Sequence, residues 1–294
     1  MIAIDWGTST FRAYRLAPDG AIIDRRSAEL GILAVSEGKF AEALESQVRD
    51  WLDADAGPVV MSGMIGSRQG WKEAPYALCP AGSEEIAARM VEVQWGISRS
   101  AWIVPGLRCR DAQGVPDVMR GEETQILGAL DDVSERSAWV CLPGTHSKWV
   151  HLEGGRITRF ATFMTGEVFA VMKAHSILGR MMVDTRVDPV AFGSGVLRAR
   201  ESGGLLHHLF GVRTRGLLGD LSDDDSAGYL SGLLIGHELA ALPRLNGTVY
   251  LLGAPQLVRL YTEALKCYGV DTSILDADAA VRGLFKLAQM LPRS

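Results

Sequence analysis

Little in this sequence points to a secreted, membrane-spanning or metal-cluster protein. Only four of its 294 residues are cysteine, none of them pairs as C-x-x-C, and none lies near a histidine at metal-ligand spacing. Few, scattered cysteines are typical of a reducing cytosol, so neither a disulfide framework nor a cysteine-based metal site is expected. A run of about 18 apolar residues is also missing, which argues against a membrane-spanning helix.

Runs of basic residues are missing as well, and the net charge is −5 at pH 7. A surface for nucleic acid or for an anionic membrane is therefore not expected. The first residues, MIAID, lack the positive region followed by an apolar region that marks a signal peptide. We expect a cytoplasmic protein that acts on soluble partners. Its oligomeric state is left open, with a homodimer as one option.

What is present is an ordinary globular composition, with 47% hydrophobic and 22% charged residues. The chain is about twice as long as a typical domain, so two domains are expected. Each half opens with a strand, a turn of small hydroxyl residues and another strand, which indicates one plan used twice. We place the boundary between an N-terminal domain, 1–117, and a C-terminal domain, 118–294.

Strand and helix patterns alternate along both halves, which favours an α/β fold. Three antiparallel strands are expected first, and apolar spacing then predicts helices at 39–52 and 83–95. The second helix would begin at a serine followed by two glutamates, which suit a helix N-terminus. The stretch 186–225 is glycine-rich, charged and less periodic, and we interpret it as an insertion or a mobile segment.

The first strand runs directly into DWGTST, residues 5–10. The carboxylate of Asp5 can hold Mg²⁺, directly or through water, because magnesium prefers hard oxygen ligands and keeps several waters. The small residues Gly7, Thr8 and Ser9 allow backbone N–H groups and hydroxyls to approach phosphate oxygens. The alternative is a tight hairpin whose turn is capped by the aspartate, and residue types alone do not decide between the two.

A second turn of the same kind, PGTHSK, occupies residues 143–148. Gly144 permits a close approach, Thr145 and Ser147 are hydroxyl donors, and Lys148 or His146 is a possible cation. One G-T-x-S turn is nonspecific, but two at the same place in two similar halves favour a pair of hairpins that enclose a triphosphate.

A helix that begins with Gly121, Glu122 and Glu123 precedes this second hairpin. A carboxylate at such a helix start can act as a general base. The alternative, favoured on residue types alone, is a helix with acidic residues in its first turn.

Two further loops follow predicted strands. Gly253 and Ala254 form a small-residue turn that could lie against a planar ring, although an ordinary strand-to-helix turn is the simpler interpretation. The loop 62–71 carries Arg68 and Gln69, and loops at the ends of strands often bind ligands in α/β folds. An arginine suits a carboxylate, and a solvated side chain is the alternative.

The order of these motifs resembles the actin-like ATPase superfamily, which includes hexokinase and glycerol kinase. Four strings are similar to the 2-dehydro-3-deoxygalactonokinase family in particular, and the likeness spans essentially the whole chain. They are DWGTSTFRAY (5–14), SGMIGSRQGW (62–71), MRGEETQ (119–125) and LPGTHSKW (142–149), together with LLGAP (251–255) as the adenosine motif of the superfamily.

This resemblance implies two RNase H-like domains with a nucleotide cleft between them, and transfer of the ATP γ-phosphate to the 6-hydroxyl of 2-dehydro-3-deoxy-D-galactonate in galactonate catabolism. Asp5 would organise Mg²⁺, and Glu122 would stand where many relatives carry an aspartate base, with Glu123 still open for that role. The residues implied in binding are Gly7, Thr8, Ser9, Gly144, Thr145, His146 and Ser147 for phosphate, Gly253 and Ala254 for adenosine, and Arg68, Gln69 and Arg12 for the acid sugar.

The N-terminal domain would then carry the substrate loop and the first phosphate hairpin, and the C-terminal domain the second hairpin and the adenosine turn. Two alternatives remain at this point. One is another actin-like kinase or a phosphohydrolase that acts on a different hydroxy acid or on polyphosphate. The other is a nucleotide-dependent switch without catalysis, which would have no need of a carboxylate clamp.

Overall fold

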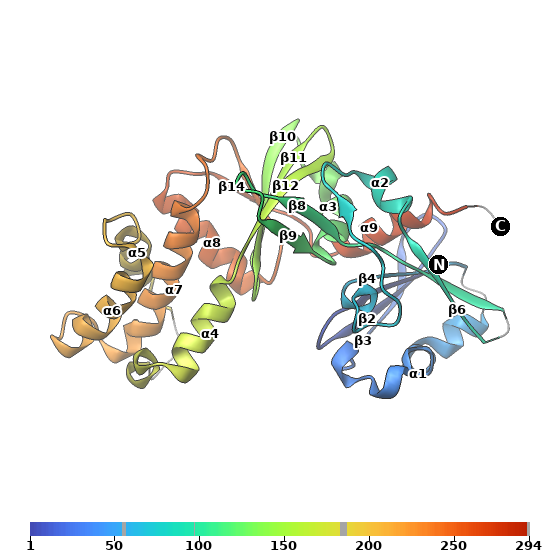
Figure 1. Ribbon diagram of the computed structural model, residues 1–294, viewed down its shortest axis with the longest axis horizontal. Helices are drawn as coiled ribbons and strands as arrows, with labels where there is room; N and C mark the ends of the chain where they lie inside the picture. Colours follow the sequence, from blue (N-terminus) through green and yellow to red (C-terminus); the bar gives the residue numbers. More distant parts are fainter. Residues whose placement is uncertain (55–56, 97, 183–186, 293–294) are drawn as a thin grey trace. The chain divides into compact units, whose positions relative to one another are not determined.

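The computed structural model describes residues 1–54, 57–96, 98–182 and 187–292. It is a mixed α/β chain, as expected, and by its internal contacts it divides into two compact units (Figure 1). Unit 1 comprises Met1–Ser137, Val150–Phe160 and Leu275–Ser294, and unit 2 comprises Ala138–Trp149 and Ala161–Ile274. No described helix is both long and apolar enough to span a membrane.

Unit 1 is built on a six-stranded sheet in the order β3-β2-β1-β4-β7-β6. The opening meander is antiparallel, as predicted, whereas β4 runs parallel to β1 and β7 parallel to β4. The carboxyl ends of β1 and β4 therefore meet at one edge of the sheet. The strands are β1 (Ile2–Trp6), β2 (Phe11–Leu16), β3 (Ile22–Ala28), β4 (Val59–Ser62), β6 (Val91–Trp95) and β7 (Arg99–Ile103).

Helix α1 (Phe40–Asp53) supplies much of the core on this sheet. Its buried residues recur at helical spacing, and Phe40 meets Trp6 edge to face, with ring centroids 5.9 Å apart. Trp6 also packs edge to face on Phe11, at 4.9 Å. Each fully buried large side chain contributes about 1.5–3 kcal/mol, so this cluster fixes the end of β1 firmly.

The predicted helix at 83–95 is wrong beyond its first turns. Helix α2 covers only Ser83–Ala87, and strand β6 follows at Val91–Trp95. In that strand Val93 and Trp95 are buried while Gln94 is exposed, which is the two-residue period of a strand. Pairing with β7 overrides the helical spacing.

A small sheet not predicted from the sequence leads into helix α3. It consists of β5 (Ala77–Leu78), β8 (Leu107–Arg110) and β9 (Pro116–Met119), and α3 spans Glu122–Ala129. Helix α3 packs on α9 (Ala279–Ala288) so closely that a Cβ on Gly128 would lie 1.8 Å from the carbonyl oxygen of Ala279. This packing places α3 in unit 1, whereas a boundary at residue 117 would separate it from the N-terminal sheet.

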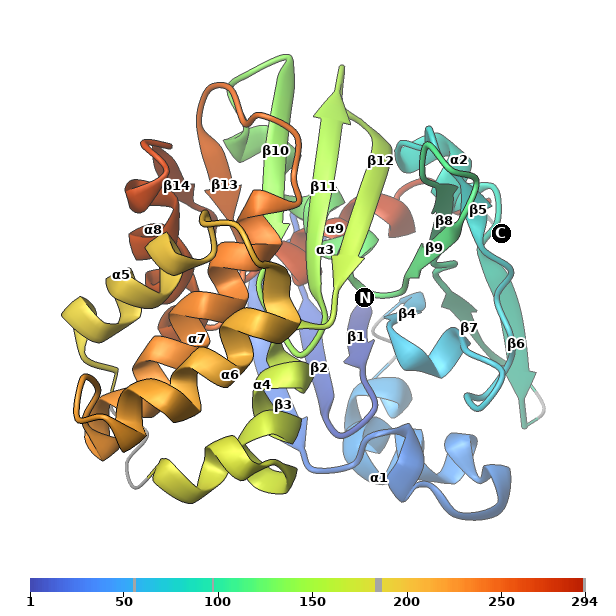
Figure 2. The same ribbon diagram turned by 60° about the vertical axis from the view of Figure 1, so that its left-hand side comes forward.

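The second large sheet has five strands in the order β12-β11-β10-β13-β14, and β10, β13 and β14 run parallel. In unit 2, helices α5, α6 and α7 lie side by side (Figure 2). The strands are β10 (Ser137–Leu142), β11 (Ser147–Glu153), β12 (Arg156–Phe163), β13 (Val249–Leu251) and β14 (Thr272–Ile274), and the helices are α4 (Thr165–His175), α5 (Pro189–Arg198), α6 (Gly204–Leu217), α7 (Asp223–Ala240) and α8 (Pro255–Cys267).

The stretch 186–225 is mostly helical, although its first residue lies outside the described part of the chain. The side chain of Asp188 caps α5 by accepting hydrogen bonds from the backbone N–H groups of Val190 and Ala191, each at 2.9 Å. Close contact with α7 then stabilises α5, because a Cβ on Gly195 would lie 2.2 Å from the carbonyl oxygen of Tyr229. Such packing is not visible in periodicity.

Candidate functional site

The first hairpin, residues 7–10, joins β1 to β2 in unit 1. The backbone N–H of Gly7 donates to the carbonyl of Thr10 at 2.9 Å and closes the turn. The N–H of Ile32 donates to the carbonyl of Gly7 at 3.0 Å and supports the turn from behind. Thr8 and Ser9 are exposed, so their hydroxyls can meet a ligand.

Asp5 stands at the end of β1 beside this hairpin and is half-buried. Burial raises the pKa of its carboxyl, and the opposing influence is the charge of Arg12, whose Nη1 lies 3.2 Å from Oδ2. Among the described residues no three acidic, histidine or cysteine side chains gather as a metal site. The donor set here is one hard carboxylate, which fits Mg²⁺ if water and phosphate supply the remaining ligands.

Two glycines with positive φ bring the start of α3 to the same edge of the sheet. Gly63 follows β4 with φ 92°, and a Cβ there would lie 2.8 Å from the carbonyl oxygen of Trp6 and 3.3 Å from Oδ1 of Asp5. Gly121 precedes α3 with φ 107°, and a Cβ there would lie 3.4 Å from Cα of Gly63. The positive φ favours glycine at both positions and the close approach requires it at Gly63, so the ends of β1, β4 and β9 converge here.

The two glutamates that open α3 have different environments. Glu123 is fully buried: its Oε2 accepts from the N–H of Gly121 at 2.7 Å, and its Oε1 accepts from the hydroxyl of Thr124 at 2.9 Å. Burial, and next the charge of Glu122, raise the pKa of Glu123 to about 7. Glu122 is half-buried, and its Oε2 accepts from the N–H of Arg120 at 3.0 Å.

The loop after β4 holds Arg68 and Gln69 in exposed positions. The side chain of Arg68 is 87% exposed, and its Nε lies 3.2 Å from Oε1 of Glu73. Within unit 1 these two residues therefore lie at the surface of their own loop, whereas Asp5 and Glu122 share the edge formed around Gly63.

The second hairpin, residues 143–147, belongs to unit 2 and splits into two parts. Thr145 and His146 are exposed and Gly144 is half-buried, so these residues can meet a ligand. Ser147 is fully buried, which is where the structure departs from the picture of a phosphate-binding hydroxyl.

The hydroxyl of Ser147 belongs to a buried network centred on Glu238 of α7. Glu238 is 3% exposed and accepts hydrogen bonds from Ser147 at 3.2 Å, from Tyr261 at 2.8 Å and from Nε1 of Trp149 at 2.6 Å. The hydroxyl of Thr165, at the start of α4, also donates to it. Burial raises the pKa of Glu238, and the four donors act in the opposite direction. The network ties the hairpin to α4, α7 and α8.

Helix α4 also contacts the exposed part of this hairpin. A Cβ on Gly166 would lie 2.5 Å from the carbonyl oxygen of Gly144, and the N–H of Glu167 donates to the carbonyl of Thr145 at 3.0 Å. The side chains of His146 and Glu167 are hydrogen-bonded, with Nε2 and Oε2 2.5 Å apart. Glu238, Thr165 and Glu167 were not singled out in the sequence, because their meeting with the hairpin depends on helix packing.

The turn at Gly253 and Ala254 lies beside the second hairpin, because β13 runs parallel to β10. A Cβ on Gly253 would lie 3.2 Å from the carbonyl oxygen of Pro143, and both turn residues are exposed. Unit 2 thus brings the predicted adenosine-binding turn, Gly253 and Ala254, close to the predicted phosphate-binding hairpin.

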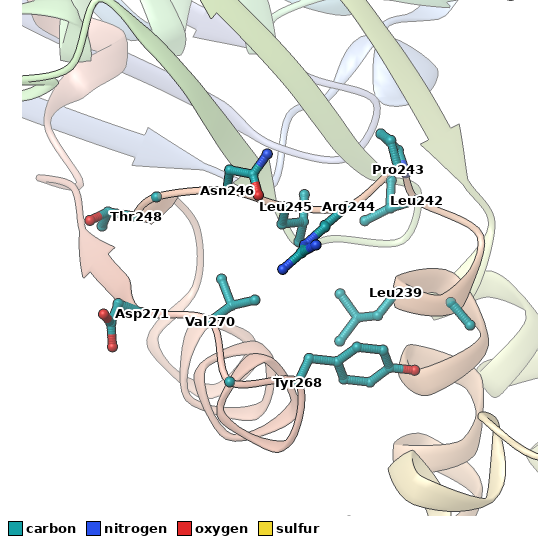
Figure 3. Close-up of a pocket in the computed structure, with 13 residues that line it drawn as sticks. Leu239, Leu242, Pro243, Arg244, Leu245, Asn246, Thr248, Tyr268, Val270 and Asp271 are labelled. Atoms are coloured by element: carbon teal, nitrogen blue, oxygen red, sulfur yellow. The ribbon is translucent and has the colours of Figure 1, made fainter.

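A cavity of about 550 Å³ in unit 2 lies away from these residues (Figure 3). Leu239, Arg244, Tyr268 and Asp271 are among the residues that line it. It sits where β13 and β14 begin, whereas Gly253 follows the end of β13. None of the candidate site residues lines this cavity, so its size does not make it the functional site.

A solved structure of low sequence identity shares the overall fold of this chain. The activator of 2-hydroxyisocaproyl-CoA dehydratase from Clostridium difficile, with bound ADPNP, shares 13% identity at a TM-score of 0.51, covering 99% of this chain and 96% of that one. At that identity the likeness concerns the fold alone. It agrees with the mixed α/β fold described above.

The family follows from closer relatives. A family model described as 2-keto-3-deoxy-galactonokinase matches residues 5–287. A probable 2-dehydro-3-deoxygalactonokinase of Rhizobium meliloti is 41% identical over 288 residues, covering 95% of this chain and 93% of that protein. The 2-dehydro-3-deoxygalactonokinase of Escherichia coli is 36% identical over 282 residues, covering 95% and 94%.

A crystal structure from Sinorhizobium meliloti, described as a candidate 2-dehydro-3-deoxygalactonokinase, superposes with a TM-score of 0.89 at 40% identity and covers 98% of both chains. The chain belongs to the 2-keto-3-deoxy-galactonokinase family. The resemblance drawn from its sequence strings is thereby confirmed.

Proposed function

We propose that this protein transfers the γ-phosphoryl group of ATP to the 6-hydroxyl of 2-dehydro-3-deoxy-D-galactonate, as a step of galactonate catabolism in the cytoplasm. The observation that carries the proposal is family membership over residues 5–287, a range that contains both hairpins and the acidic helix start. A different acceptor, or a nucleotide switch without catalysis, is not favoured by relatives that are named as kinases of this one acid.

The nucleotide would bind in a cleft between two RNase H-like domains. The N-terminal part supplies the acceptor site and the first phosphate hairpin, and the C-terminal part supplies the second hairpin and the adenosine turn. Support comes from the exposure of Thr8 and Ser9 in one unit, and of Thr145 and Gly253 in the other. Closure of the domains on both ligands would exclude water from the transfer.

In this mechanism the acceptor oxygen attacks the γ-phosphorus, the bond to the β–γ bridging oxygen breaks, and ADP leaves. Mg²⁺, when bound, neutralises charge on the phosphate oxygens, and Asp5 would hold it directly or through water. Backbone N–H groups and hydroxyls of the hairpins at Thr8, Ser9, Gly144 and Thr145 would hold the phosphates, while the N–H of Gly7 closes the first turn. Arg12, released from Asp5, would contact phosphate or substrate.

The proton of the attacking hydroxyl would pass to a carboxylate at the start of α3. We assign this role to Glu122, because it is half-buried at the edge that Gly63 and Gly121 form, while both oxygens of the buried Glu123 accept hydrogen bonds within its own helix start. Transfer of a phosphoryl group depends mainly on positioning and charge stabilisation, so the base contributes less than the phosphate and metal contacts.

The direct test is ADP release by the purified protein with ATP, Mg²⁺ and a panel of 2-keto-3-deoxy sugar acids. We expect release that depends on 2-dehydro-3-deoxy-D-galactonate and a phosphorylated product at its 6-position. The gluco epimer and polyphosphate serve as comparison acceptors. Release that no acid stimulates would contradict the proposal and favour a nucleotide switch.

A further inference from the structure

Arg120 lies between strand β9 and Gly121, two residues before the proposed base. Its guanidinium is held from three sides: Nη2 donates to the carbonyl of Ala74 at 2.8 Å, and the group lies over the ring of Tyr76, 4.4 Å from the centroid. The third contact is with the loop after β4, because a Cβ on Gly66 would lie 2.8 Å from Nη1. All of these residues belong to unit 1.

Three polar atoms of Arg120 and of the loop after β4 are buried and lack a hydrogen-bond partner among the described residues. They are Nε and Nη1 of Arg120 and the hydroxyl oxygen of Ser67, the residue that follows Gly66. In the described part of the chain the only other side-chain atom in this condition is the hydroxyl of Thr262, in unit 2. A buried group left unpaired costs about 1–3 kcal/mol, and a charged group costs more. Two such nitrogens on one guanidinium, with a third such atom on the adjoining loop, call for an acceptor.

We propose that Arg120 and Ser67 bind the carboxylate of the acceptor acid. This inference rests on the proposed function and names the part of the site that selects an acid over a neutral sugar. A guanidinium offers N–H donors to carboxylate oxygens: Nε and Nη1 lack acceptors, Nη2 keeps a second hydrogen beside its bond to Ala74, and the serine hydroxyl is a further donor. Because these atoms are buried, the proposal requires the loop 64–70, whose Gly66 lies against Nη1, to shift when the acid binds.

Arg120 and the proposed base, Glu122, lie on one short segment at the start of α3. The acid carries its carboxylate at one end of a six-carbon chain and the reacting hydroxyl at the other. Arg120 and Glu122 are held together, since the N–H of Arg120 donates to Oε2 of Glu122 at 3.0 Å. One short segment would therefore recognise one end of the acid and accept the proton from the other.

Arg68, which the sequence suggested for this role, is less suited to it. Its side chain is 87% exposed and already faces Glu73. Water screens an exposed ion pair, so such a contact contributes little to affinity. The guanidinium of Arg120, in contrast, is shielded and has two N–H-bearing nitrogens still without an acceptor.

The decisive variant is Ser67→Ala, because it removes an unpaired buried hydroxyl. We expect its thermal stability to equal or exceed that of the parent, its KM for the acid to rise about tenfold, and its KM for ATP to stay unchanged. Arg120→Lys keeps the charge and loses the fork, and its KM for the acid should rise on the order of a hundredfold. Arg68→Gln tests the competing arginine, and Glu73→Gln, an exposed carboxylate a few residues further on, is the control, with little change expected in either constant.

Several outcomes would overturn the inference. An unchanged KM for the acid in Ser67→Ala would do so even if Arg120→Lys fails to fold, and so would a large increase confined to Arg68→Gln. The parent protein separates this inference from the proposed function. If the parent phosphorylates the acid and both variants bind it normally in calorimetry, the carboxylate site is wrong and the kinase proposal stands. If the parent phosphorylates no acid, the kinase proposal itself fails.

Discussion

The two hairpins have similar sequences, but their serines lie in different environments. In the first hairpin Ser9 is exposed, and the turn is supported by backbone hydrogen bonds from residues 32–33. In the second hairpin Ser147 is buried and bonded to Glu238 and Tyr261. The comparison teaches that a G-T-x-S turn can present its hydroxyls to a ligand or use one of them as an anchor. Only the surrounding packing decides which.

The largest effect is expected at the carboxylate beside the first hairpin. Asp5→Asn removes the only charged oxygen ligand that we assign to Mg²⁺, so kcat should fall by about a hundredfold or more. Steady-state kinetics over a range of Mg²⁺ concentrations measure this. Asp24→Asn, which changes an exposed carboxylate on β3 of the same sheet, should leave kcat unchanged. Equal kcat for Asp5→Asn and the parent would remove Asp5 from the metal site.

The next prediction concerns Glu122 and Glu123 at the start of α3 and the pH dependence of protein stability. The pKa of Glu123 is raised from 4.5 to about 7 in the folded protein, so its stabilising effect is present below pH 4.5 and is lost as the pH rises through about 7. At about 1.4 kcal/mol per pK unit, the free energy of unfolding falls by about 3 kcal/mol over this pH range. Glu123→Gln should remove this loss. The free energy of unfolding of the variant, measured in urea, should therefore rise relative to that of the parent between about pH 5 and about pH 8.

Glu122→Gln is the companion variant. It should lower kcat and keep most of the pH dependence of unfolding, because burial is the larger cause of the raised pKa of Glu123 and the charge of Glu122 is the second. A fully active Glu122→Gln protein would move the proton-accepting role to Glu123 or away from α3.

A smaller effect is expected at the anchor of the second hairpin. Glu238→Gln keeps the shape of the side chain but turns an NH₂ group toward donors, so at least one buried donor loses its acceptor. The free energy of unfolding should fall by about 1–3 kcal/mol, and KM for ATP should rise as the hairpin loosens. The control is Glu263→Gln, an exposed carboxylate on α8. A Glu238→Gln protein as stable as its control would show that the network does not hold the hairpin.

The sequence predicted the opening meander, α1 and both hairpins, because these depend on local period and on turn residues. It did not predict β6, where pairing with β7 overrides helical spacing at Val91–Trp95. It also placed Ser147 among the ligand contacts, because nothing local reveals that Glu238, 91 residues further on, lies beneath it. The roles of Arg68 and Arg120 differ for the same reason: exposure is set by packing and not by residue type.

The measurement that tests the contrast between the hairpins most directly is a paired comparison of Ser9→Ala and Ser147→Ala, with KM for ATP and the free energy of unfolding determined for both. We predict that Ser9→Ala raises KM for ATP with unchanged stability. Ser147→Ala should lower the free energy of unfolding by about 1 kcal/mol, since Tyr261 and Glu238 lose a partner. A stable Ser147→Ala protein with weakened ATP binding, beside a normal Ser9→Ala protein, would contradict the account.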